Sequence, residues 1–154
     1  MKQYLPRWIK ASVYKHFDDR KQGVPLFLEG DKRSTNEKQA YAELRMDGPF
    51  FKKLTAIEWN VYIEVNVLVQ TIRKREKLYT NSTNSGIIAE AFTDHIDIYR
   101  YGGELVDDES FVGCLNLNMD GKRPLTIRDV GESRPTEPLN QTQVEGHYSN
   151  EFEF

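Results

Sequence analysis

The sequence predicts an α+β domain with a mostly antiparallel, twisted sheet, a long central strand, an N-terminal helix and a second short helix. The strand signal comes from residues 57–72, where seven of the eight odd positions are apolar and most even positions are polar. Successive side chains of a strand point to opposite faces, so this alternation is typical of a strand with one buried face. The helix signal comes from residues 6–22, where apolar side chains recur at helical spacing. We expect one domain over residues 1–154, with a mobile tail at 149–154.

The strand over residues 57–72 is long for such a domain. Its sixteen residues would span roughly 54 Å at about 3.4 Å each. A compact domain of this size is only about 40 Å across. Either the strand bends or carries a bulge, or one of its ends projects and pairs with another subunit.

The first helix is expected over about residues 6–22. Pro6 suits a first helical turn, where its missing N–H costs nothing, and Gly23 is a typical stop. Arg20 and Lys21 in the last turn complement the helix dipole. The stripe that we expect to face the core consists of Leu5, Trp8, Ile9, Ser12, Val13, His16 and Phe17.

Shorter strands flank the long one. Residues 24–29 are apolar but contain a proline, which predicts an edge strand. Residues 30–39 are polar and predict an exposed loop. Residues 40–47 alternate and predict a strand that ends at Asp47-Gly48-Pro49. The connection from there to the long strand is expected to be too long for a tight hairpin.

The second half of the chain predicts a short helix and further strands. Residues 80–86 are rich in Ser and Asn, which predicts a loop that caps a helix over about 85–93. A turn at 119–122 is expected to join two strands as hairpin partners. The strands of this half are expected over about residues 96–101, 111–118, 125–130 and 141–149.

Composition and charge are those of an ordinary chain with no membrane span. The N-terminus carries charges where a signal peptide needs its apolar run, and Cys114 is the only cysteine, so a reducing compartment is expected. The net charge of −3 is unevenly spread: residues 1–23 carry +4 and residues 129–154 carry −5. These two ends could attract each other within a subunit or between neighbours, or form two solvated surfaces.

No motif for catalysis, a cofactor or a metal is present. The run Asp94-His95-Ile96-Asp97 offers two potential metal ligands on one side of a strand but no third, so we expect no metal site. His16, His95 and His147 lie in separate elements, and no nucleotide-binding loop or nucleophile elbow occurs. We therefore expect a protein that is not an enzyme and needs no cofactor.

The order of elements resembles that of the tail-terminator family, the tail-completion or neck proteins of tailed bacteriophages. The phage lambda tail terminator is a representative of this family. Three phrases carry the resemblance: RWIKASVYKHFDD as an opening helix, YAELRMDGP before the long strand, and VEGHYSNEF as a closing strand. It covers about residues 8–148. The family has no signature motif, so no individual site residue is carried over.

The resemblance implies a virion structural protein whose sheet joins neighbours into a ring, typically a hexamer. Such a ring caps the tail tube, halts its growth and provides the head-to-tail joining surface. The implied partners are copies of the chain itself, the tail-tube protein on one side and a head-connector or neck protein on the other. DNA would pass through the lumen without sequence-specific contact, and assembly would take place in the host cytoplasm.

Two different patches are expected to form the contacts, because a head-to-tail ring needs two unlike surfaces on each subunit. The basic patch lies at the far end of the long strand and consists of Gln70, Arg73, Lys74, Arg75 and Lys77. The acidic patch is the aromatic C-terminus, consisting of Glu151, Phe152, Glu153 and Phe154. We expect the two to meet between subunits, or the C-terminus to bind the tube protein; a solvated strand end and a frayed terminus are the alternatives.

Two rival functions stay open. One is another neck component, such as a head-closure or tube subunit. The other is a cone-shaped α+β domain that binds a ligand or acts as a small enzyme, which would need polar groups on the concave face of its sheet. The apolar odd positions of residues 57–72 count against that rival.

Overall fold

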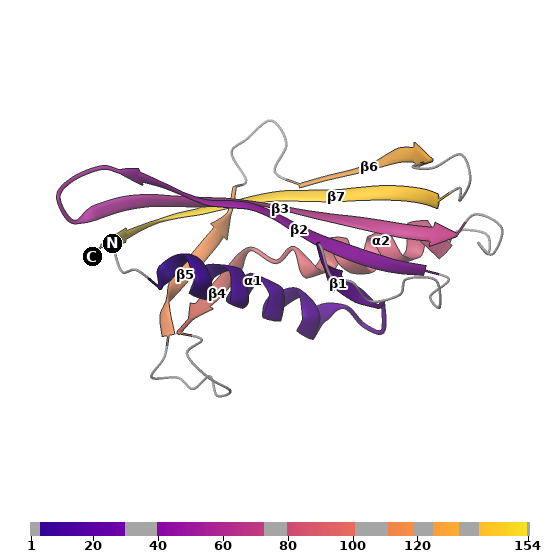
Figure 1. Cartoon of the computed structure of the whole chain (residues 1–154), viewed down its shortest axis with the longest axis horizontal. Coiled ribbons are helices and arrows are strands. Elements are labelled where there is room, and N and C mark those ends of the chain that lie inside the picture. The colour runs from indigo at the N-terminus through magenta and orange to yellow at the C-terminus, as the bar shows by residue number, and fades with distance from the viewer. Residues whose placement is uncertain are drawn as a thin grey trace.

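The computed structural model describes residues 4–29, 40–72, 80–100, 111–118, 125–132 and 139–153. Its elements are α1 (Leu5–Arg20), β1 (Leu26–Leu28), β2 (Ala40–Lys53), β3 (Glu58–Ile72), α2 (Thr80–Ala91), β4 (His95–Tyr99), β5 (Phe111–Leu117), β6 (Leu125–Glu132) and β7 (Leu139–Glu153). The predicted α+β class is confirmed. Both helices lie on one face of a curled sheet, which we call the inner face (Figure 1). The opposite face is the outer face.

The described strands form one sheet in the order β1-β2-β3-β7-β5-β4, with β6 paired to β7. The predicted central strand is confirmed as β3, which pairs antiparallel with β2 on one side and with β7 on the other. The pairing with β7 covers the whole strand, from Glu58 opposite Glu153 to Ile72 opposite Leu139. Among the strand pairings of the described residues, that of β1 with β2 alone is parallel.

The length of β3 is accommodated by a hairpin that projects from the body. Strand β2 continues to Lys53, and in Figure 1 its turn into β3 reaches beyond the start of α1. The backbone N–H groups of Leu54 and Thr55 donate to the Glu58 carbonyl, at 2.9 and 3.2 Å, and the Thr55 hydroxyl accepts from the Glu58 N–H at 3.0 Å. One end of β3 does project, but its partner strands belong to the same chain.

The prediction that β2 ends at Asp47-Gly48-Pro49 and is followed by a long connection was wrong. The register between β2 and β3 shifts between Asp47 and Phe50, and the strand then continues. A proline can lie there because β1 pairs only with residues 42–44, so among the described residues this part of β2 is an edge. At a sheet edge the missing N–H of a proline costs no ladder hydrogen bond.

The core lies between the inner face and the helices. The odd positions of β3 from Val61 to Val69 are fully buried, which confirms the predicted alternation. Helix α1 contributes the predicted stripe, with Trp8 half-buried at its margin. The helix ends near Gly23, whose φ of +85° suits glycine. The fully buried residues of α1 in this core are Leu5, Ile9, Val13 and Phe17.

The first turns of α2 correct a second prediction, since residues 80–86 were expected to be a loop. Asn81 is buried and accepts a hydrogen bond from the Thr71 hydroxyl at 3.0 Å, while its amide donates to Thr142. The Thr142 hydroxyl in turn donates to Asp129 at 2.8 Å. These bonds hold the start of α2 against β3, β7 and β6. They stabilise a helix in a segment with weak helix propensity.

Two predictions about the last strands were also wrong. Strand β6 pairs with β7 rather than with β5, from Leu125 opposite Gly146 to Glu132 opposite Asn140. Strand β7 runs to Glu153 instead of ending at Ser149, so residues 149–153 are part of the sheet and not a mobile tail. No helix of the described residues is long and apolar enough to cross a membrane.

Gly146 provides a test of the packing between β7 and the region after α2. A Cβ at this position would lie 2.6 Å from a ring carbon of Phe92, which is itself buried against Phe17 and Tyr148. Because this ring cannot move away, Gly146→Ala should lower the free energy of unfolding by about 1–3 kcal/mol in urea denaturation.

The matched control is Gly86→Ala on the exposed side of α2. A Cβ there meets no atom within 4 Å. The substitution should raise the stability by roughly 0.5–1 kcal/mol, since alanine favours a helix. Equal effects of the two substitutions would contradict the described packing.

Candidate assembly surface

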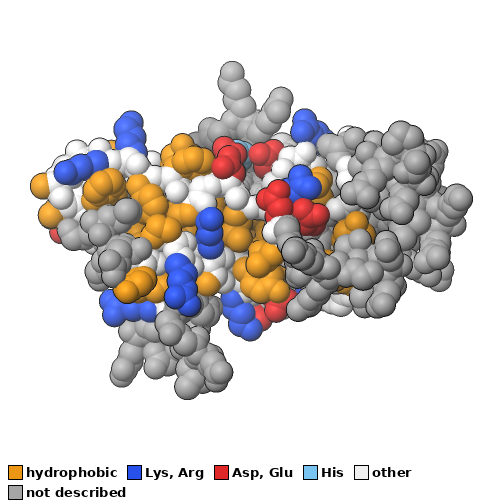
Figure 2. All heavy atoms as spheres, viewed as in Figure 1, with side chains coloured by type: hydrophobic (Ala, Val, Ile, Leu, Met, Phe, Trp, Pro, Cys, Tyr) orange, Lys and Arg blue, Asp and Glu red, His pale blue; other side chains and the backbone are white. Residues whose placement is uncertain are grey.

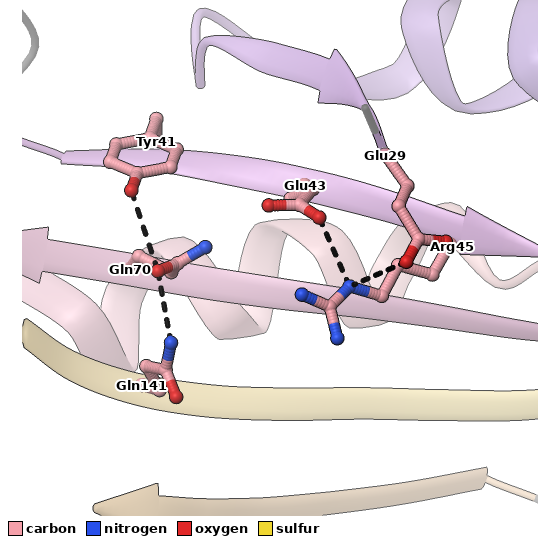
Figure 3. A network of polar contacts seen from close by, with 6 residues as sticks. All are labelled: Glu29, Tyr41, Glu43, Arg45, Gln70 and Gln141. Atoms are coloured by element: carbon pink, nitrogen blue, oxygen red, sulfur yellow. Dashed lines mark hydrogen bonds and ion pairs between the residues drawn. The ribbon is translucent and has the colours of Figure 1, made fainter. Parts of the chain in front are cut away.

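Gln70, the one described member of the predicted basic patch, lies inside a polar ladder. Only 4% of its surface is exposed. Its side-chain oxygen accepts hydrogen bonds from the Tyr41 hydroxyl at 3.4 Å and from the Gln141 amide at 3.0 Å, in a row across three strands (Figure 3). Gln70 therefore has a structural role in the sheet and offers little exposed surface for an interface. The other predicted members, Arg73, Lys74, Arg75 and Lys77, lie outside the described residues.

The acidic patch is part of β7. Glu151 and Glu153 are exposed on the outer face, whereas Phe152 points to the inner face and is 8% exposed. A Cβ placed on Gly113 would lie 2.8 Å from the Phe152 ring, so the aromatic side chain occupies the space that this glycine leaves free. The expectation of an exposed aromatic at 152 was wrong, since Phe152 belongs to the core. Phe154 lies outside the described residues.

The two predicted patches lie at opposite ends of the same strand pair. Glu153 is opposite the first residue of β3, and the basic run follows the last residue, Ile72. Fifteen residues of strand span roughly 50 Å, so Glu153 lies far from the last residue of β3.

The projecting hairpin exposes apolar side chains that the sequence did not single out. Phe50 and Tyr62 stack across β2 and β3 with ring centres 4.7 Å apart, and they are 37% and 39% exposed. Leu54 and Ile57 in the turn are 43% and 47% exposed. A cluster of exposed apolar side chains is typical of a protein–protein contact. The sequence PFFKKLTA carries a signal, but it was predicted to be a connection, and Ile57 was predicted to be the first residue of the long strand.

An open polar cleft of about 490 Å³ lies between α1 and β4. Its serine and histidine do not form a nucleophile–base pair: the Ser12 hydroxyl accepts from the Tyr99 N–H at 3.0 Å, and His16 Nε2 donates to the Ala91 carbonyl at 2.9 Å. His95 and Asp97 share a face of β4, as the alternation predicts, and His95 Nε2 lies 3.7 Å from Asp97 Oδ1. Within the described part of the chain no group of three or more metal-binding side chains occurs.

The polar contacts of the cleft attach α1 to the segment that follows α2. His16 is 8% exposed and its ring packs edge-on against Phe17. Burial lowers the pKa of His16 below 6.5; the hydrogen bond to the Ala91 carbonyl opposes this shift, and the nearby Arg20 adds to it. The hydrogen bond from His16 therefore attaches α1 to the end of α2.

Comparison with known proteins shows the fold and goes no further. No protein-family model matches the sequence, and no curated protein matches it. Among solved structures, a chain without a descriptive name superposes with a TM-score of 0.52 at 11% sequence identity. The match covers 97% of this chain and 95% of that chain. At this identity the likeness concerns the fold alone, over essentially the whole length of both chains.

His16 predicts how the stability depends on pH. Its pKa is lower in the folded chain than in the unfolded chain, so below pH 6.5 the unfolded chain binds a proton that the folded chain does not. The free energy of unfolding should fall as the pH drops through this range, by at most about 1.4 kcal/mol per pH unit. His16→Gln keeps a donor for Ala91 but cannot titrate, so the slope should become flatter.

The control for this experiment is His147→Gln, which changes a histidine on the outer face of β7, away from the cleft. It should keep the slope of the wild-type chain between pH 6.5 and pH 4.5 in urea denaturation. A wild-type slope that survives His16→Gln would contradict the role assigned to this residue.

Proposed function

We propose that this chain is a tail terminator of a tailed bacteriophage, which forms a ring on the last ring of the tail tube, stops tube growth and offers the surface to which the head binds. The projecting hairpin carries the proposal, since its turn exposes Leu54 and Ile57 beyond the body of the subunit. An isolated domain gains nothing from such side chains, whereas a subunit of a ring can bury them. The α+β fold agrees with the family that the sequence resembles.

The arrangement of the sheet supports an assembly protein over a ligand-binding domain. The inner face of β3 from Val61 to Val69 carries apolar side chains that are fully buried in the core shared with α1 and α2. The polar cleft lies elsewhere, between α1 and β4, and its serine and buried histidine bond to the backbone. We therefore propose a structural role without catalysis.

In this function the subunits act by binding one another and by presenting binding surfaces to the tube and the head. A heterologous ring uses two unlike surfaces on each subunit, and closure by rotation limits the number of copies. The ring would present one rim to the tube and the other to the head, with DNA passing through the lumen. The proposed partners are thus copies of the chain, the tail-tube protein and a head-side neck protein.

Removal of the gene from the phage that carries it should produce particles that distinguish the neck functions. We expect overlong or headless tails in electron micrographs, because nothing would stop tube growth or receive the head. Heads that leak DNA beside tails of normal length would instead indicate a head-closure protein. Normal particles would contradict the proposal.

The hairpin can be tested in the same system by supplying variants from a plasmid. Leu54→Ser combined with Ile57→Ser should leave the free energy of unfolding within about 0.5 kcal/mol of wild type, because both side chains are exposed. Tails should nevertheless remain uncapped, since the apolar contact is lost. Ile127→Ser, at a residue 54% exposed on β6, is the matched control and should restore normal tails. Restoration by the hairpin variant would contradict a role for the turn.

A further inference from the structure

We propose that the subunits of this ring bind one another face to back, with the exposed side of α1 on one copy against the hairpin end of the outer face on the next copy. The first surface, the helix surface, consists of Tyr4, Arg7, Trp8, Lys10 and Arg100. The second, the acidic surface, consists of Phe50, Glu58, Tyr62, Glu151 and Glu153. The inference rests on the proposed function and names the contact that builds the ring.

The helix surface combines cations with aromatic rings. Arg7, Lys10 and Arg100 are exposed, and none has a carboxylate partner among the described residues. The Tyr4 and Trp8 rings lie 6.2 Å apart, and the Arg100 guanidinium lies 5.8 Å from the Trp8 ring centre. Mainly basic and hydrophobic side chains are visible around the first half of α1 (Figure 2). This surface suits an acidic, aromatic partner.

The acidic surface places like charges directly opposite each other. Glu58 of β3 is paired in register with Glu153 of β7, and Glu151 follows two residues away on the same outer face. None of the three carboxylates has an ion-pair partner among the described residues. Like charges in opposed positions destabilise a sheet, and this cost disappears when cations approach. Within the described part of this surface, Lys52 is the only cation of the outer face near them.

The positions of the two surfaces on the subunit point to another copy of the chain as the partner. The helix surface and the acidic surface lie at the same end of the subunit, since α1 begins where the hairpin and the end of β7 lie (Figure 1). They belong to opposite faces of the sheet, so they cannot meet within one chain. Stacking by rotation brings the helix surface of one copy onto the acidic surface of the next. Repetition of this unlike contact closes a ring when the rotation between copies divides a full turn, which is the case that the proposed function requires.

The two surfaces match in chemistry as well as in position. Three cations on one side face three carboxylates on the other, which directs the encounter and fixes the register. The Tyr4 and Trp8 rings on one side and the Phe50–Tyr62 stack on the other supply the apolar contact. Arg7 and Lys10 belong to the basic end of the sequence, and Glu151 and Glu153 belong to its acidic end.

A charge exchange tests the contact by sedimentation analysis of the purified chain at low ionic strength. Arg7→Glu with Lys10→Glu reverses the helix surface, and Glu151→Lys with Glu153→Lys reverses the acidic surface. Each pair should weaken self-association by more than about tenfold, because like charges then face each other. The chain that carries all four substitutions should associate nearly as well as wild type. Added salt should weaken the association of the wild-type chain.

Two controls separate an effect of charge on association from an effect on folding. Glu90→Lys changes an exposed carboxylate of α2 outside both surfaces and should leave the association unchanged. The unfolding midpoint of every variant is measured in parallel, and recovery in the four-substitution chain shows that the substitutions themselves are tolerated.

Three results would overturn the proposal: unchanged association of both reversed chains, no recovery in the exchanged chain, or a wild-type chain that stays monomeric at every concentration in low salt. The proposed function is judged separately, from tail length in particles that lack the protein. Overlong tails together with any of these three results would keep the function and discard this contact.

Discussion

The pairing of β3 with β7 is the interaction on which the rest of the structure depends. It runs without a register shift from Glu58 opposite Glu153 to Ile72 opposite Leu139. Because every residue of β3 has a partner on β7, its alternating side chains are fixed to one face or the other over the full length. The inner face then forms the core with α1 and α2. The edge of β7 that faces away from β3 pairs with both β5 and β6.

The two ends of this strand pair have different properties. At the Gln70 end, the side chains of Tyr41 and Gln141 on the outer face are hydrogen-bonded to that of Gln70. At the Glu58 end, the strands leave the body as a hairpin, and carboxylates and aromatic rings stay exposed. A long strand therefore supplies both the core of the subunit and a surface outside it. This division of one strand into two roles supports the proposed assembly function.

Side-chain alternation made β3 predictable from the sequence, helical spacing of apolar residues made the stripe of α1 predictable, and together they indicated the fold class. The errors arose where distant residues decide local structure. Pro49 lies within β2 because that part of the strand is an edge, and residues 80–86 are helical because Asn81 bonds to Thr71 and Thr142. The burial of Phe152 depends on the space left by Gly113 in a neighbouring strand. The exposed apolar side chains of the hairpin were missed because Phe50 and Leu54 were assigned to a connection, and strand pairing alone brings Phe50 beside Tyr62.

The most direct measurement of the face-to-back contact is zero-length cross-linking of assembled protein made from an equal mixture of ¹⁴N- and ¹⁵N-labelled chains. Lys10 should be joined to Glu151 or Glu153, and the linked peptides should include pairs of mixed isotope, which only a contact between copies can give. Cross-links among other residues in an assembled ring, without any between Lys10 and the end of β7, would contradict it.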